Sequence, residues 1–413
     1  MNTPNIRFKG FSGDWKQRKV GDMTVELSEY GNLQSGYPLL TSSRSGLMFQ
    51  NDFRDKTSTD NLETLFSVVP YGKCTYRHMS DDNIFHFNIN TITEKGLVSR
   101  EYPVFDASEN NNLSFLIQYL NSSPEFTRFC AERKLGGTRT RLYYKNLCEF
   151  KLHAPNKNEQ DKIAEFFTNI DNLITLHQRK CDSLKQVKKY MLQKMFPKHG
   201  EKVPEIRFAG FTGDWEQLKL EDISANYKYS IVDGPFGSDL KTIDYKDDGI
   251  LVMQSNYITG GKFEIKQPYF VSPDKAKKLS RCHCKGGDIL IAKIGANFGI
   301  CNIIPASIKN AVLSSNCMKV DLDENHNNNF YMQYLNTLYE SGFYYSLIGI
   351  TAQPALSLKF MKSLKVPSPS LEEQRKIASF LENIDNLITL HQRKSDSLKE
   401  IKKFMLQNMF PNK

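Results

Sequence analysis

Residues 159–197 read EQDKIAEFFTNIDNLITLHQRKCDSLKQVKKYMLQKMFP, and residues 373–411 read EQRKIASFLENIDNLITLHQRKSDSLKEIKKFMLQNMFP. The two stretches align without gaps and are identical at 30 of 39 positions. Neither contains glycine, and neither contains proline before its last residue, Pro197 or Pro411. Because glycine and proline interrupt helices, each stretch is predicted to form one long helix of about 57 Å, at about 1.5 Å per residue.

Apolar residues recur every seven positions along the first stretch, a pattern typical of helices that pair side by side. One row holds Ile163, Ile170, His177, Leu184 and Met191. A companion row three residues further on holds Phe166, Leu173, Lys180, Val187 and Lys194, and the next positions, Phe167, Ile174, Cys181 and Met195, widen the stripe. The two long helices are therefore predicted to pack against each other along these rows.

A second repeat opens each half of the chain. Residues 4–23 (PNIRFKGFSGDWKQRKVGDM) match residues 204–223 (PEIRFAGFTGDWEQLKLEDI), with Trp15 and Trp215 at equivalent positions. Between the repeats, residues 24–155 and 224–369 share little with each other. A duplicated frame with two unlike inserts indicates one scaffold that presents two specificities.

The inserts carry short apolar runs typical of strands, TLFSVVPYG (64–72), GILVMQSNYI (249–258) and DILIAKIG (288–295). Residues 114–123 and 328–348 read as helices. We therefore predict an α/β (α+β) fold with a pseudo-twofold internal repeat, in which two globular domains are separated by two long antiparallel helices. The predicted boundaries are 1–158 for the first domain, 159–197 for the first helix, 198–372 for the second domain and 373–413 for the second helix.

Composition restricts the class of protein. The 413-residue chain carries a formal net charge of +9, which indicates an anionic partner, most commonly nucleic acid. No run approaches the roughly 18 apolar residues of a membrane span, and the start MNTPNIRFKG has no signal-peptide core, so a cytoplasmic protein without a membrane partner is expected. The eight cysteines are then expected to be reduced. RCHCKGG (281–287) is too short to supply four zinc ligands by itself, and no metal site is expected.

Several motifs recur in a fixed order. The Pro-x-x-x-Glu-Gln sequences PNKNEQ (155–160) and PSLEEQ (369–374) precede the long helices, and both heads contain GDW. The second insert contains DGPFGSDLK (233–241), GDILIAKIGANFG (287–299) and GITAQPALS (349–357). Because these motifs occur in this order and those of the frame occur twice, the whole chain resembles the specificity subunit of a type I restriction-modification system.

The resemblance implies a non-catalytic, sequence-specific DNA-binding subunit that directs adenine methylation and restriction by partner subunits. In that family each variable region is a target recognition domain that reads half of a bipartite site in double-stranded DNA. Two copies of a DNA methyltransferase subunit dock on the helix pair, and restriction/translocase subunits complete the complex. The first variable region departs from the pattern, because GGTRTRLYY (136–144) replaces GITAQPALS and no GDIL counterpart is found.

The residues themselves give no support for catalysis. An adenine methyltransferase would need an acidic residue or asparagine before Pro-Pro and an aromatic residue, and neither this motif nor a glycine-rich turn for the methyl donor is present. GGKF (260–263) lacks the spacing and the hydroxyl of a P-loop. A nuclease motif would have to join Asp274 to Glu400 across 126 residues. The chain is therefore expected not to be an enzyme and to need no cofactor.

The candidate DNA-contacting residues combine cations that suit phosphate or guanine, amides that suit adenine, and tyrosines that can stack or contact sugar. In the first insert they lie in GGTRTRLYY and in two rival loops, SSRSG (42–46) and TYRHMSDDN (75–83). A solvated basic surface is the alternative for GGTRTRLYY, whereas KAKKLSRCHCK (275–285) suits phosphate better than bases. The set is Arg44, Arg77, Lys134, Thr138, Arg139, Arg141, Tyr143, Tyr144, Gln254, Asn256, Tyr257, Lys293, Asn297, Thr351 and Gln353.

The polar residues repeated within NIDNLITLHQRK are candidates for partner binding, because a packed seam does not require identical outer faces. They are Thr175, Gln178, Arg179, Thr389, Gln392 and Arg393. A recent duplication that has not yet drifted would also explain them. Two other functions stay open: a freestanding two-domain DNA-modifying enzyme, which would bind a methyl donor, and a coiled-coil adaptor, which a steep salt dependence of DNA binding would exclude.

Overall fold

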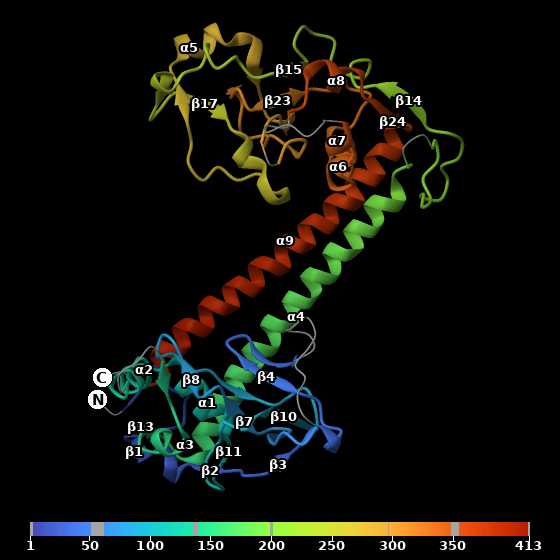
Figure 1. Ribbon diagram of the computed structural model, residues 1–413. Coiled ribbons are helices and arrows are strands. Elements are labelled where there is room, and N and C mark those ends of the chain that lie inside the picture. The colour runs from blue at the N-terminus through green and yellow to red at the C-terminus, as the bar shows by residue number, and fades with distance from the viewer. Residues whose placement is uncertain are drawn as a thin grey trace. The chain divides into compact units, whose positions relative to one another are not determined.

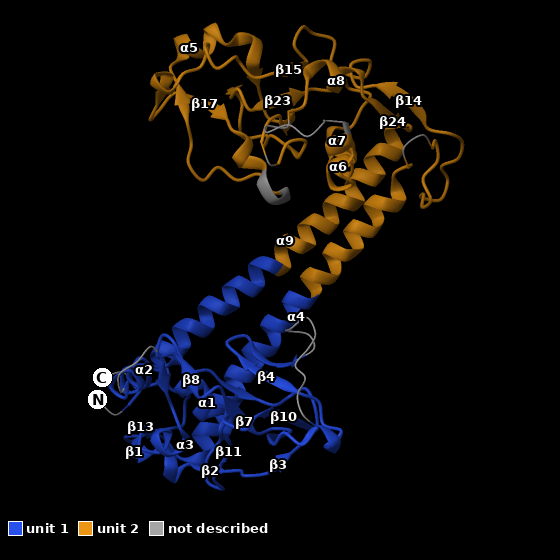
Figure 2. Cartoon of the chain, viewed as in Figure 1, with its two compact units in different colours: residues 1–179, 392–413 blue, residues 180–391 orange. Residues whose placement is uncertain are grey.

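The computed structural model describes residues 3–50, 62–134, 139–198, 201–295, 297–347 and 355–411. The chain forms two compact units (Figure 2): unit 1 holds residues 1–179 and 392–413, and unit 2 holds residues 180–391. Each unit combines a sheet-rich part with half of each long helix, α4 (Lys157–Met195) and α9 (Leu371–Asn408) (Figure 1). Both predicted helices are present, and each begins two residues earlier than predicted.

Unit 1 is built from short antiparallel sheets. The largest has the strand order β2 (Thr24–Glu26), β11 (Val104–Ala107), β7 (Cys74–Tyr76), β9 (Phe87–Ile89), and a second has the order β10 (Lys95–Ser99), β6 (Phe66–Pro70), β3 (Tyr30–Gly31). Three strand pairs are β1 (Lys16–Lys19) with β13 (Lys151–Ala154), β4 (Leu40–Ser43) with β5 (Gly46–Phe49), and β8 (Met79–Ser80) with β12 (Thr140–Arg141). The helices are α1 (Leu113–Ser122), α2 (Pro124–Glu132) and α3 (Tyr144–Leu147). The strand predicted within 64–72 and the helix predicted at 114–123 are confirmed as β6 and α1.

Unit 2 contains a four-stranded antiparallel sheet and a five-stranded mixed sheet. The first has the order β15 (Ile231–Asp233), β23 (Cys317–Val320), β20 (Ile289–Ala292), β21 (Cys301–Ile303). The second has the order β16 (Tyr245–Lys246), β18 (Phe270–Val271), β17 (Ile250–Met253), β22 (Ala311–Leu313), β19 (His283–Cys284), and β17 and β22 run parallel. The unit also contains one two-stranded sheet, formed by β14 (Glu216–Lys219) and β24 (Lys365–Ser368). Its shorter helices are α5 (Pro273–Lys278), α6 (Asn328–Glu340), α7 (Phe343–Leu347) and α8 (Leu358–Ser363). The strands predicted within 249–258 and 288–295 are confirmed as β17 and β20, and the predicted helix 328–348 divides into α6 and α7.

Local sequence explains how unit 1 assembles around its helices. The side chain of Asn112 caps α1 by accepting a hydrogen bond from the amide of Phe115, and Ser123 caps α2, whose first residue is a proline. The buried faces of both helices are aromatic: Phe126 packs on Phe87 with ring centroids 5.6 Å apart, and Phe115 packs on Phe410 at 5.6 Å. Residues from the end of the chain therefore belong to the core of unit 1.

The repeated heads join the helix starts in the same way in both units. Arg7 donates hydrogen bonds to the carboxylate of Glu159 at 2.6 and 2.7 Å, and Arg207 donates to Glu373 at 2.7 and 2.8 Å. Each arginine also donates to the carbonyl oxygen of the glycine in its GDW motif at 2.6 Å. Both carboxylates are buried. These ion pairs account for the glutamate in the repeated Pro-x-x-x-Glu-Gln motif.

The glutamine of that motif connects each long helix to the insert. Gln160 donates to the carbonyl oxygen of its motif's proline at 2.9 Å and accepts a hydrogen bond from the amide of Asn112 at 2.9 Å. Gln374 makes the same two contacts, each at 2.8 Å, with Asn327 as the donor. Asn112 and Asn327 cap α1 and α6, so both inserts are attached to the frame at a helix N-terminus.

Helices α4 and α9 pack against each other within each unit, in antiparallel directions. In unit 1, Asp171 of α4 pairs with Lys402 of α9 at 2.7 Å, and in unit 2, Lys188 of α4 pairs with Asp385 of α9 at 2.8 Å. The two aspartates are 214 residues apart, and so are the two lysines. The sequence repeat thus makes equivalent interhelical contacts in the two units.

The structure corrects the predicted phase of the helix seam. Ile163 and Ile170 of the first row are buried, but the companion row that is buried beside them lies four residues further on, not three. Cys181 is 1% exposed, whereas Leu173 is 44% exposed and Lys180 is also exposed. The sequence offers two overlapping apolar rows, and only contact with the second helix selects between them.

Candidate nucleic-acid interface

Three loops of unit 1 that the sequence presented as rivals form one surface. Strand β12 pairs with β8, so that Arg141 lies opposite Met79, and the Leu142 amide donates to the His78 carbonyl oxygen at 2.8 Å. Ion pairs complete the surface: Arg139 donates to Asp81 at 2.8 Å, and Arg44, from the turn between β4 and β5, pairs with Asp82. Residues far apart in sequence therefore place their cations together.

We call Arg44, Arg77, Arg139, Arg141 and Tyr143 the arginine surface. All five side chains are exposed, and the ring of Tyr143 stacks on His78 with centroids 5.7 Å apart. Guanidinium groups beside an exposed aromatic ring can contact phosphate, guanine or an unstacked base.

Asp82, the partner of Arg44, carries a negative charge at neutral pH. Hydrogen bonds from Arg44 and Ser80 lower the pKa of Asp82 to about 2, so this carboxylate is ionised at neutral pH. Both arginine–aspartate pairs are solvent-exposed, and such pairs contribute little to stability. A DNA phosphate could therefore replace the aspartates at low cost.

The other candidates in unit 1 behave differently. Tyr144 shares a hydrogen bond of 2.9 Å with Thr24 and packs against Phe105, so its partly buried ring lies at the edge of the core. That it contacts DNA stays a prediction. Lys134 is exposed at the end of α2. Thr138 lies outside the described residues.

In unit 2, four strands end at one edge. Strands β15, β17, β20 and β22 end at Asp233, Met253, Ala292 and Leu313. Backbone hydrogen bonds join the segments that leave these strands: Gly234 donates to the Cys317 carbonyl at 2.8 Å, Ser314 to Met253 at 2.9 Å, and Lys293 to Asn316 at 2.8 Å. The candidates Gln254 and Lys293 thus belong to the same strand-end edge, at which loops commonly form binding sites.

The strand-end edge also contains residues that the sequence analysis did not select. The carboxylate of Asp233 accepts a hydrogen bond from the Lys293 ammonium at 2.8 Å and lies 3.6 Å from the Arg281 guanidinium. The Arg281 guanidinium lies 5.8 Å from the ring centroid of Phe236, which is 70% exposed. The DGPFG sequence (233–237) was the signal that could have pointed to these residues. A phenylalanine among turn residues is often exposed, and an exposed aromatic ring indicates a binding surface.

Gly234 shows why the DGPFG motif requires glycine. A Cβ atom added at this position would lie 1.7 Å from the carbonyl oxygen of Ser314. No side chain can move to relieve this contact, since the obstacle is backbone. The glycine therefore permits the close approach of β15 to the loop after β22.

The remaining candidates in unit 2 divide into exposed and buried side chains. Asn256 and Asn297 are exposed, and Asn297 accepts a hydrogen bond from the Tyr339 hydroxyl at 3.5 Å. Tyr257 is 1% exposed and donates to the carbonyl of Gln267, so its side chain lies in the core and not on the surface where the sequence analysis expected it. Thr351 and Gln353 lie outside the described residues.

The candidate partner-binding residues lie on the long helices. Thr175, Arg179 and Arg393 are exposed, and Gln178, Thr389 and Gln392 are partly exposed. The hydroxyl of Thr175 donates to the carbonyl of Asp171 at 2.8 Å, and the Gln392 amide donates to Asp396 at 3.1 and 3.2 Å. Their positions are available to a partner without unpacking the seam.

The described residues form neither a metal site nor a membrane span. Within them, no three His, Cys, Asp or Glu side chains come together as metal ligands, and no helix is long and apolar enough to cross a membrane. In RCHCKGG, Cys282 and Cys284 are buried in the sheet core and His283 is exposed.

Two sheet-rich units on a duplicated helical frame, each with an exposed polar edge, define a two-domain recognition scaffold. The chain belongs to the type I restriction-modification specificity family: the family model described as "Type I restriction modification DNA specificity domain" matches residues 86–186 and 213–400. Specificity subunits of this family are non-catalytic, which agrees with the prediction from sequence.

Individual relatives and structures support the family and the fold. The chain is 25% identical over 272 residues to the type I restriction enzyme MjaVIII specificity subunit of Methanocaldococcus jannaschii, covering 64% of this chain and 62% of that protein. It is 22% identical over 190 residues to the HindI specificity subunit of Haemophilus influenzae, covering 44% and 41%. The matches thus span less than two thirds of either relative's length.

Among solved structures, the S subunit of a type I restriction-modification system from M. genitalium matches over 100% of both chains, with a TM-score of 0.63 and 14% identity. A chain from a study of complex assembly and conformational transition of the type I R-M system matches over 96% of this chain and 98% of its own length, with a TM-score of 0.51 and 14% identity. At these identities the matches show the fold, and they confirm two sheet-rich domains with two long helices packed together.

Proposed function

We propose that the chain is the DNA-reading subunit of a type I restriction-modification complex and that its two units read the two halves of a bipartite target. The observation that carries the proposal is the contrast between the frame and the inserts. Equivalent residues form the frame contacts of both units. In contrast, the residues of the arginine surface of unit 1 have no counterparts among the residues of the strand-end edge of unit 2. One scaffold therefore carries two different reading surfaces.

The chemistry of the two surfaces fits different tasks. Exposed arginines on unit 1 suit guanine and phosphate, while Gln254 and Asn256 on unit 2 offer amides that can pair bidentately with adenine. In each unit, the polar side chains lie in loops held by short strands. Loops on a rigid scaffold are common positions for recognition residues.

The proposal extends to the partners. Thr175, Gln178 and Arg179 recur as Thr389, Gln392 and Arg393, so each long helix offers the same polar positions to a partner. Two copies of a DNA methyltransferase subunit would bind these positions, and restriction/translocase subunits would join the complex. The chain itself would contribute specificity in the cytoplasm, and adenine methylation would come from its partners.

Exchange of one insert tests the proposal. Replacing residues 24–155 with the corresponding region of another specificity subunit should change one half of the recognition sequence and leave the other half unchanged. Methylated adenines mapped across the genome of cells carrying the chimera and its partners would show both halves at once. If both halves changed together, or if no methylation depended on this chain, the proposed function would be wrong.

A further inference from the structure

A hollow of about 620 Å³ lies beside the five-stranded sheet of unit 2. Its walls come from the segment before β15, from α5 and the turn after it, and from the loop between β21 and β22. The cations that line it are Lys228, Lys277, Arg281, Lys309 and Lys319, with His283 beside them. Its described lining includes no aspartate or glutamate. We call this hollow the cationic pocket.

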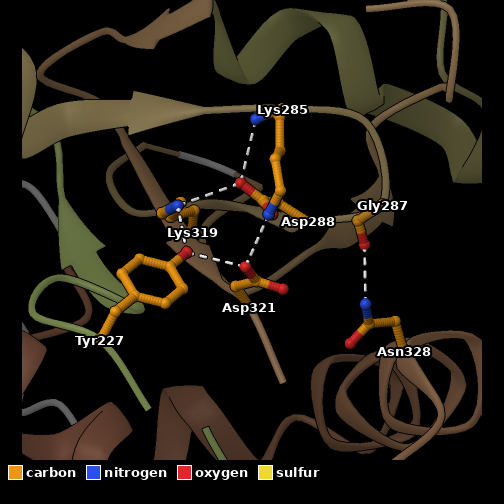
Figure 3. A network of polar contacts seen from close by, with 7 residues as sticks. All are labelled: Tyr227, Lys285, Gly287, Asp288, Lys319, Asp321 and Asn328. Atoms are coloured by element: carbon orange, nitrogen blue, oxygen red, sulfur yellow. Dashed lines mark hydrogen bonds and ion pairs between the residues drawn. The ribbon is translucent and has the colours of Figure 1, made fainter. Parts of the chain in front are cut away.

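The floor of the cationic pocket is a network of charged groups, of which Lys319, Asp288 and Asp321 are buried and Lys285 is exposed (Figure 3). Lys319 is 2% exposed, and it donates to Asp288 at 3.1 Å and to the Tyr227 hydroxyl oxygen at 3.0 Å. Lys285 pairs with Asp321 at 2.8 Å and with Asp288 at 3.4 Å, and the Tyr227 hydroxyl donates to Asp321 at 2.7 Å. Two lysines and two aspartates balance, so the floor adds no net charge.

The positive charge of the pocket therefore comes from its rim. Within the described part of the chain, no carboxylate forms an ion pair with Lys228, Lys277 or Lys309, and Arg281 reaches only Asp233, at 3.6 Å. These cations come from three separate segments of the chain and surround one hollow. Like charges gathered in this way repel one another unless an anion lies between them.

The rim also contains an unusual backbone conformation, at Tyr229. Tyr229 has a φ of 75°, in the left-handed region that side chains other than glycine seldom adopt. Its ring is 39% exposed, and the ammonium of Lys228 lies 5.0 Å from the ring centroid. Strained residues of this kind gather at binding sites, where the surrounding structure holds them.

We propose that the cationic pocket holds phosphates of the DNA backbone beside the bases that unit 2 reads. Arg281 connects the two sites, because it lines the pocket and also lies next to Asp233 and Phe236 at the strand-end edge. Lys228, Lys277 and Lys309 provide the contacts to phosphate. The inference rests on the proposed function, since it adds a positioning site to a unit already proposed to read DNA.

The pocket fits a backbone phosphate better than a free nucleotide. The polar side chains of the floor that could face a base, Lys319 and Tyr227, already have hydrogen-bond partners. Among the described residues that line the pocket, Lys228, Lys277 and Lys309 have no carboxylate partner, and their ammonium ions suit phosphate oxygens. Contacts to phosphate fix the position of DNA without reading its sequence.

Salt titration of DNA binding tests the proposal. In the full chain with its partner subunits, Lys277→Gln combined with Lys309→Gln should reduce the slope of log Kd against log salt by about two, because each phosphate contact contributes about one. A labelled random-sequence duplex is the probe. The matched control is Lys219→Gln with Lys365→Gln, since these lysines are exposed on β14 and β24, at the other side of unit 2 from α5 (Figure 1). The control variant should keep the wild-type slope.

The outcomes separate the inference from the proposed function. If the pocket variant melts like the wild type and keeps the wild-type slope, the pocket does not hold phosphate, although DNA binding stands. If ATP competes with the duplex more strongly than sodium chloride at matched ionic strength, and the pocket variant loses that competition, the pocket belongs to a free nucleotide and the proposal is overturned. If the wild-type complex shows no salt-dependent DNA binding, the proposed function fails as well.

Discussion

At the scale of single residues, one guanidinium in each unit holds the frame together. Arg7 and Arg207 each bind a carboxylate whose side chain is almost completely buried, with 0% exposure at Glu159 and 1% at Glu373. A buried carboxylate without its cation is unstable, because the desolvation of the charge is no longer compensated. The requirement for arginine at positions 7 and 207 therefore comes from electrostatics and not from packing.

Replacing either arginine should destabilise the unit to which it belongs. We expect Arg7→Ala to lower the stability of unit 1, and Arg207→Ala that of unit 2, by about 3 kcal/mol, the usual cost of breaking a buried ion pair. Urea unfolding followed in each variant would measure the loss. Arg375→Ala, an exposed arginine near the start of α9, is the control and should change little. Equal stability of all three variants would show that the ion pairs do not hold the frame.

A buried histidine makes unit 1 sensitive to pH. Burial lowers the pKa of His78, with Arg141 and Arg77 adding to the effect and Glu101 opposing it. The ring is 4% exposed, and within the described structure its Nδ1 has no hydrogen-bond partner. Because the folded pKa lies below the unfolded value, the unfolded state takes up the proton first as pH falls.

Unit 1 should therefore lose stability as the pH falls from about 7.5 to about 5.5, through the range in which an unfolded histidine titrates. His78→Phe keeps a ring that can stack on Tyr143 and removes the titration, so this variant should lose less stability over the same range. Urea midpoints at the two pH values would measure the difference. His283→Gln, at an exposed histidine, should lose stability as the wild type does. A His78→Phe variant with an unchanged pH dependence would contradict the explanation.

At the scale of secondary-structure elements, the two long helices differ at one buried position of their shared seam. Cys181 of α4 and Ser395 of α9 are equivalent in the repeat, and each is 1% exposed. Cys181 donates a weak hydrogen bond to the Ile388 carbonyl at 3.9 Å, whereas no partner of the Ser395 hydroxyl lies among the described residues. A buried hydroxyl without a partner costs free energy that a thiol largely avoids.

The repeat itself supplies the variant that tests this difference. Ser395→Cys places in α9 the residue that α4 already has, and it should stabilise the helix pair by about 1 kcal/mol. The reciprocal change, Cys181→Ser, should destabilise it by a similar amount. Thermal melting of both variants under reducing conditions would measure the two shifts. Shifts of the same sign would show that burial of the hydroxyl is not the cause.

At the scale of the whole molecule, duplication of the frame predicts the stoichiometry of assembly. Since the polar positions of NIDNLITLHQRK occur twice, we expect one chain to bind two methyltransferase subunits. Native mass spectrometry of the co-expressed complex should show two partners for each chain. Arg179→Glu combined with Gln178→Ala should reduce the complex to one partner, and the matching change at Arg393 and Gln392 should do the same. One partner per wild-type chain at saturation would contradict the expectation.

Much of the frame could be predicted from sequence because its information is local or repeated. The absence of glycine and of internal proline over 159–197 and 373–411 predicted two long helices, and the matched heads predicted two equivalent units. Apolar runs predicted β6, β17 and β20. Motif order predicted the family, and the family model confirms it.

The sequence by itself therefore determined the duplicated frame, its helices and the family, since periodicity depends on neighbouring residues and a repeat can be read by aligning the sequence with itself. Only the tertiary structure decided which row of α4 forms the seam, because both rows are apolar and the choice depends on the partner helix. It also decided that Arg44 and Arg139 pair with the neighbouring residues Asp82 and Asp81, and that Tyr144 and Tyr257 pack against the core. Pairing between distant strands brings such residues together, and no local pattern encodes that pairing.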